Sequence, residues 1–161
     1  MSTGKLLVYA SLISIFAVFI WGAFLSASGF AAACGVASNS VISSAWPYCN
    51  GSLGFPSNWP AQVEYIHRTL SVFATVVLVA SNVVVWRMTP RPVAAARTLI
   101  LALALLCLEI YIGGAFINSN LNIAVGTVSL TTATTIFLLL VLAADRMYLN
   151  DKGLVARGAP A

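Results

Sequence analysis

The chain alternates between long apolar segments and shorter polar connections. The apolar segments cover about 6–27, 65–86, 96–117 and 123–144. Each is long enough to cross the roughly 30 Å hydrocarbon layer of a membrane as a helix of about 20 residues. The pattern predicts an all-α integral membrane protein, a bundle of four transmembrane helices that forms a single domain over residues 1–161.

The connections between the predicted helices differ in length and character. A long loop over about 28–64 joins the first helix to the second, and it carries no charge until Glu64. Pro90 and Pro92 interrupt the chain between the second and third helices. The asparagine-rich stretch 118–122 marks a short turn between the third and fourth. The long loop is therefore the largest polar segment outside the predicted helices.

Composition narrows the class of protein further. Hydrophobic residues make up 60% of the chain and charged residues 7%, whereas soluble domains carry about 25% charged residues. These values exclude a soluble globular domain, a disordered chain and a nucleic-acid-binding protein. The net charge of +4 comes from 8 Lys and Arg against 4 Asp and Glu. In a membrane protein a surplus of basic residues usually sets the orientation of the helices in the membrane.

The positions of the basic residues predict the orientation in the membrane. They lie before the first helix, in the second connection and in the tail: Lys5; Arg87, Arg91 and Arg97; Arg146, Lys152 and Arg157. Cytoplasmic segments carry the excess of Lys and Arg. We therefore expect both termini and the second connection in the cytoplasm, and the loop 28–64 on the extracellular side of the cell membrane.

Two cysteines lie in this outer loop. Cys34 and Cys49 are 15 positions apart, and an oxidising outer face favours a disulfide between them. Such a bond would be a structural staple for the loop. The same pair could instead serve a thiol-disulfide oxidoreductase that passes electrons to a neighbour, although the spacing is not Cys-x-x-Cys. Cys107 lies inside the third helix, where we interpret it as a packing residue.

The start of the second predicted helix carries an unusual set of ionisable residues. Glu64 and His67 are three positions apart and so share one helical face, and ionisable groups at a membrane boundary are candidates for function. An imidazole can bind haem iron, a carboxylate can accept a proton, and the fork of Arg68 suits a haem propionate. The alternative is an interfacial cap, with Glu64 near the helix N-terminus.

Polar and small residues also interrupt the third predicted helix. Glu109 must face the bundle interior, where it could contact a ligand or form a polar contact with the threonine-rich fourth helix. Gly113 and Gly114 would let either a neighbouring helix or a flat macrocycle approach the backbone. Because His67 is the only histidine, one chain cannot assemble a zinc or binuclear copper site from the usual ligands.

Taken in order, these residues resemble a known family. The motifs are Gly22-Ala23, Cys34, Trp46-Pro47-x-Cys49-Asn50-Gly51, Glu64-Tyr65-x-His67-Arg68 and Gly113-Gly114. This series resembles the haem A synthase family, which is related to cytochrome oxidase assembly. Usual members have eight helices in two similar halves. The chain is similar to one half, as in the compact four-helix members known among archaea.

The resemblance implies an oxidoreductase that converts a methyl group of haem O to a formyl group, giving haem A for terminal oxidases, with haem B as a further cofactor. His67 would be an axial ligand of haem iron, Glu64 the catalytic carboxylate, and Cys34 and Cys49 the disulfide. The remaining pocket or propionate-binding residues would be Arg68, Glu109, Gly113, Gly114 and Ser129. Implied partners are haem O synthase, an electron donor, membrane lipid and a second copy of the chain, a dimer restoring eight helices.

The chain departs from the family pattern in three respects. One is a longer spacing between the cysteines, with an insertion between Cys34 and Trp46. The second histidine of a family half falls near Ser129, so two histidines of one chain cannot both bind the same iron. The basic residue that follows the first Gly-Ala falls on Ser26. Two other functions therefore stay open: a non-catalytic haem-binding assembly protein, and a thiol-disulfide membrane oxidoreductase.

Overall fold

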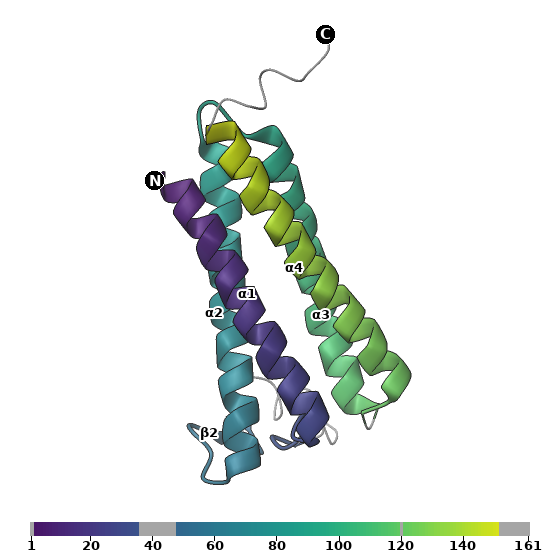
Figure 1. Ribbon diagram of the computed structural model, residues 1–161. Coiled ribbons are helices and arrows are strands. Elements are labelled where there is room, and N and C mark those ends of the chain that lie inside the picture. Colours follow the sequence, from purple (N-terminus) through teal and green to yellow (C-terminus); the bar gives the residue numbers. More distant parts are fainter. Residues whose placement is uncertain (1, 36–47, 120, 152–161) are drawn as a thin grey trace.

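The computed structural model describes residues 2–35, 48–119 and 121–151. Within them the chain forms four helices that are long and apolar enough to cross a membrane. They are α1 (Thr3–Ser28), α2 (Trp59–Arg87), α3 (Val93–Asn118) and α4 (Ile123–Asp151), and two-residue strands β1 (Tyr48–Cys49) and β2 (Ser52–Leu53) lie between α1 and α2. The helices run up and down in turn, each packed against the next, and α4 also packs against α1 (Figure 1). The protein is therefore a multi-pass, all-α membrane protein.

The second helix begins earlier than the apolar pattern indicates. The pattern places its start at Tyr65, but α2 begins six residues before that, at Trp59. The side chain of Asn58 caps the helix by accepting a hydrogen bond from the backbone N–H of Ala61 at 2.9 Å. Capping chemistry, which hydropathy does not register, therefore extends the helix into the predicted loop. As a result Glu64 lies in the second turn, outside the reach of an N-terminal cap.

Each helix turns one stripe of residues, spaced three and four apart, toward the bundle interior. On α1 and α2 these stripes meet along a seam of small residues. The hydroxyls of Ser11 and Ser81 lie 2.7 Å apart across this seam. A Cβ at Gly4 would lie 2.6 Å from the sulfur of Met88. Small side chains let transmembrane helices approach closely, so the seam packs α1 and α2 into a tight hairpin.

The two ends of the bundle are packed differently. We call the end where α1 begins and α4 ends the terminal end, and the opposite end the disulfide end. The apolar core fills the terminal end, with fully buried members such as Val8, Leu78, Leu99 and Leu140. Toward the disulfide end the α1–α2 and α3–α4 pairs diverge (Figure 1). In that half Leu25 and Glu64 are still buried. Other stripe residues there are only partly buried: Val18, Gly22, His67, Ser71, Glu109, Gly113, Gly126 and Ser129.

Candidate functional site

His67 lies on the inward stripe of α2, in the loosely packed half. Its ring rests against Gly22 of α1, where a Cβ would lie only 3.0 Å from Cε1. Gly22 therefore makes the room that the imidazole occupies. The Nδ1 atom is buried and has no hydrogen-bond partner among the described residues. Leaving a buried polar atom unpaired costs about 1–3 kcal/mol, so this nitrogen is a group that a bound ligand could satisfy.

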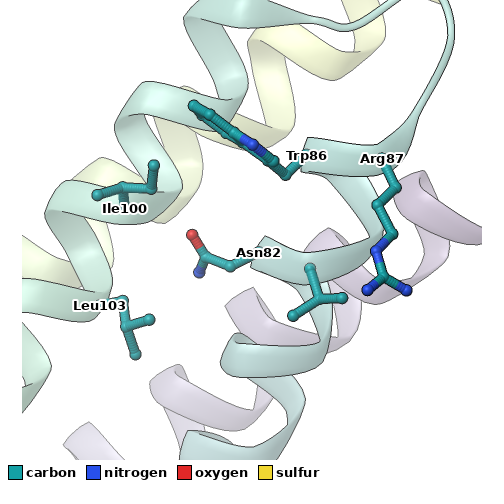
Figure 2. Close-up of a pocket in the computed structure, with 6 residues that line it drawn as sticks. Asn82, Trp86, Arg87, Ile100 and Leu103 are labelled. Carbon is teal, nitrogen blue, oxygen red and sulfur yellow. The ribbon is translucent and has the colours of Figure 1, made fainter.

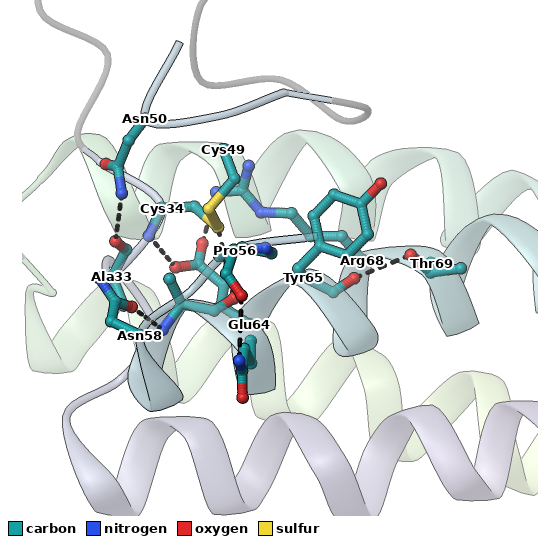
Figure 3. The surroundings of a disulfide bond; sticks show 12 residues. Ala33, Cys34, Cys49, Asn50, Pro56, Asn58, Glu64, Tyr65, Arg68 and Thr69 are labelled. Atoms are coloured by element: carbon teal, nitrogen blue, oxygen red, sulfur yellow. Dashed lines mark hydrogen bonds and ion pairs between the residues drawn. A yellow bond between two sulfur atoms is a disulfide. The ribbon is translucent and has the colours of Figure 1, made fainter. Parts of the chain in front are cut away.

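Glu64 connects α2 to the loop segment that contains Cys34. Its side chain is buried, with 2% of the residue exposed. One carboxylate oxygen accepts a hydrogen bond from Arg68 and the other accepts one from the backbone N–H of Cys34 at 2.6 Å (Figure 3). Both oxygens are thus engaged, and the carboxylate ties the Cys34 segment to the helix that carries His67. The same contact pairs Arg68, with 15% of its side chain exposed, to Glu64.

A disulfide joins Cys34 to Cys49 beside this carboxylate (Figure 3). The two residues are 0% and 4% exposed and pack with Ala61 in a small buried cluster. After Cys49 the chain turns through Asn50 and Gly51, whose φ angles are 53° and 78°. Positive φ at both positions suits an Asn-Gly pair in a tight hairpin turn. The Cys-Asn-Gly motif therefore has a conformational reason, while Trp46 and Pro47 lie outside the described residues.

A second polar group lies across α3 and α4. The hydroxyl of Ser129 donates a hydrogen bond to one oxygen of Glu109 at 2.5 Å. The other oxygen of Glu109 is buried and has no partner in the described part of the chain. One turn further along α3, a Cβ added at Gly113 or Gly114 would meet nothing within 4 Å. The expected interhelical contact therefore exists, and it leaves one buried acceptor of Glu109 unpaired.

These residues form two groups on different hairpins. Glu64, His67 and Arg68 lie on α2 next to the disulfide, whereas the Glu109–Ser129 pair and Gly113 lie on the α3–α4 pair. The described residues contain no group of three or more His, Cys, Asp or Glu side chains that could hold a metal ion. The structure brings both groups to the same half of the bundle without joining them.

Sequence reasoning missed two contacts that position this site. The indole N–H of Trp21 donates to the carbonyl of Val63 at 2.9 Å, which holds the end of α1 against the start of α2. The Cys34–Glu64 hydrogen bond links positions 30 residues apart. Neither contact has a local sequence signal, because each depends on how two helices and a loop meet. The Gly22-Ala23 motif is visible in the sequence. That Gly22 contacts the His67 ring follows only from the way α1 packs against α2.

Together these features define a four-helix membrane protein with a histidine, two carboxylates and a disulfide in the loosely packed half of the bundle. Residues 2–141 match the family model described as cytochrome oxidase assembly protein, COX15-CtaA. The chain belongs to this family, the haem A synthase family. Comparison with curated proteins gave no match, and comparison with solved structures gave none.

Proposed function

We propose that this protein is a haem A synthase that oxidises a methyl group of haem O to a formyl group in the membrane. The family supports a role in cytochrome oxidase assembly. The observation that carries the finer proposal is the imidazole of His67, which lies on an inward stripe with a buried, unpaired Nδ1. Gly22 leaves room for the ring. A neutral imidazole in such a place suits an axial ligand of haem iron.

The other residues fit a haem substrate by their chemistry. A guanidinium carries five N–H donors, so Arg68 could hold a haem propionate while it holds Glu64. Gly113 and Gly114 present bare backbone to open space, which would accommodate a flat macrocycle. Glu64, three residues from the proposed ligand, would accept a proton or stabilise positive charge at the reacting methyl carbon. The haem iron, when bound, supplies the redox chemistry.

A second copy of the chain would complete this site. His67 is the only histidine, so one chain offers one imidazole. A homodimer would bring two four-helix bundles together and restore the eight helices of usual family members. We also propose that the disulfide loop faces the extracellular side, because the termini and the second connection carry most of the basic residues.

One observation favours a second candidate, a non-catalytic haem-binding assembly protein. Both oxygens of Glu64 already hold structural hydrogen bonds, to Arg68 and to the backbone of Cys34. A carboxylate used as an anchor needs no catalytic role. The thiol-disulfide oxidoreductase has less support, because both cysteines are buried and exchange requires access to a sulfur atom.

Haem extracted from protein purified out of cells that make haem O tests the proposal. Chromatography with mass detection should find haem A or its hydroxylated intermediate in the wild type. His67→Ala should lose most of the bound haem, while Ser71→Ala, the next residue on the same stripe, should retain it. Unchanged haem content in His67→Ala would refute the ligand assignment.

Glu64→Gln separates catalysis from anchoring. A glutamine oxygen can still accept the hydrogen bond from Cys34. The neutral amide, however, cannot act as a base and cannot stabilise a positive charge as a carboxylate does. We expect Glu64→Gln to keep its haem and its disulfide while formyl formation falls by at least about 100-fold, as is typical when a general base is lost. Product formation at the wild-type rate would leave Glu64 as an anchor only. Bound haem without product in the wild type would favour the non-catalytic protein.

A further inference from the structure

A hollow lies between α2 and α3 near the terminal end, away from the candidate site. Its volume is about 360 Å³, and its lining residues are Asn82, Val83, Trp86, Arg87, Ile100 and Leu103 (Figure 2). Asn82 follows His67 by 15 residues on α2, which is about 22 Å along a helix axis. The hollow is therefore a separate feature, and the proposed haem chemistry does not use it.

The side chain of Asn82 brings an unpaired acceptor to this hollow. Its amide nitrogen donates to the backbone carbonyl of Leu78 at 2.9 Å, so the oxygen is the atom that remains for other contacts. That oxygen is buried and has no hydrogen-bond partner among the described residues. Figure 2 shows the amide projecting toward Ile100 and Leu103 of α3. Water that enters the hollow with the polar group of an occupant would supply the missing donor.

The rim of the hollow is positively charged. Arg87 lines it, and the guanidinium of Arg91 lies over the Trp86 ring, 4.5 Å from the ring centroid. Arg97 is exposed and precedes Ile100 by three residues, so both lie on one face of α3. The chain has no acidic residue over 82–103. A cationic, aromatic rim above an apolar floor matches the boundary between headgroups and hydrocarbon in a membrane.

We propose that this hollow binds one anionic phospholipid. An acyl chain would lie against Ile100 and Leu103, and the phosphate would be held by Arg87 and Arg91, because guanidinium groups pair with phosphate oxygens through two hydrogen bonds. Trp86 would lie at the level of the headgroup, as tryptophan does at membrane interfaces. A helix of a partner protein would cover the same arginines without a counter-charge, whereas a phosphodiester supplies one.

Native mass spectrometry of the full-length protein in mild detergent tests this site. Phosphatidylglycerol and phosphatidylcholine with the same acyl chains are the probes. We expect one phosphatidylglycerol per chain to bind more tightly than phosphatidylcholine. Arg87→Gln and Arg91→Gln should each weaken phosphatidylglycerol binding about fivefold, from about 1 kcal/mol for one basic residue. Lys5→Gln removes one charge at the same end of the bundle, outside the hollow, and should leave binding unchanged.

One further variant keeps the test independent of charge. Val83→Trp should fill the hollow and abolish the bound lipid. Equal binding of the two lipids would overturn the proposal, as would equal weakening by Lys5→Gln and Arg87→Gln. Retention of a partner protein at this face in place of lipid would also overturn it.

Discussion

At the scale of single residues, the unpaired polar atoms separate candidate functional positions from structural ones. Three buried side-chain atoms lack a hydrogen-bond partner in the described part of the chain: His67 Nδ1, Asn82 Oδ1 and Glu109 Oε2. Most threonine hydroxyls of α4 behave differently, because they donate to carbonyls four residues earlier in their own helix, as Thr131 does to Thr127. Polar residues that look alike in the sequence therefore differ in whether their hydrogen bonds are satisfied within the protein.

Gly22 and Gly113 form a matched pair for a prediction at this scale. Alanine is favoured over glycine in a helix by up to about 1 kcal/mol. Gly113→Ala should gain that stability in the haem-free protein, because its Cβ would meet open space. Gly22→Ala should lose stability and haem affinity, because its Cβ would press on the His67 ring. Thermal unfolding and haem titration in detergent measure both effects, and equal behaviour of the two variants would refute the role of Gly22.

At the scale of elements, the start of α2 is the best anchored part of the candidate site. Asn58 caps it, Trp21 holds the carbonyl of Val63, and Glu64 holds the Cys34 segment. These contacts come from the cap, from α1 and from the loop, so three separate segments position one helix turn. The Cys34–Cys49 disulfide adds a covalent bond within the loop that Glu64 contacts.

The disulfide should contribute mainly to stability. Cys34 and Cys49 are 15 residues apart, and closing a loop of that length stabilises a protein by about 3 kcal/mol in the chain-entropy model. The double variant with both cysteines replaced by serine should therefore unfold at a lower temperature and still bind haem through His67. Cys107→Ser, which leaves the disulfide intact, is the control. Loss of haem binding at a temperature where the double variant remains folded would show that the disulfide acts directly on the site.

At the scale of the whole molecule, the bundle is densely packed at one end and loosely packed at the other. Apolar stripe residues such as Leu78 and Leu140 close the terminal end. In the other half the same stripes carry residues that are partly exposed, such as Gly22, His67, Ser71 and Glu109. The α1–α2 and α3–α4 pairs diverge there (Figure 1). Side-chain packing is therefore denser at the terminal end than at the disulfide end.

This asymmetry predicts the pattern of amide hydrogen exchange. In detergent without haem, exchange should be faster in residues 16–28 and 107–118 than in residues 74–85, because few buried contacts protect the loosely packed half. Adding haem should slow exchange in the loosely packed half of the wild type but not in His67→Ala. Mass spectrometry of peptides from the exchanged protein measures both effects. Uniform protection along all four helices, or equal haem-dependent protection in both proteins, would contradict the prediction.

The class of fold and the family could both be predicted from the amino-acid sequence. Apolar segments of membrane-spanning length and a charged fraction of 7% are properties of composition, and they leave only a helical membrane bundle. The spaced motifs around Cys49 and His67 indicated the family that the comparison then showed. Such signals survive without coordinates because they depend on residue type and local spacing alone.

The partners of those residues became visible in the folded structure. Cys34 and Glu64 meet across 30 residues, Ser129 and Glu109 meet across two helices, and Gly22 receives the ring of His67. The start of α2 at Trp59 also depended on a cap that hydropathy does not register. The register of the helices and the divergence of the two hairpins arise from packing between segments that are distant in the sequence. The pattern of apolar and polar residues along the chain does not specify that packing.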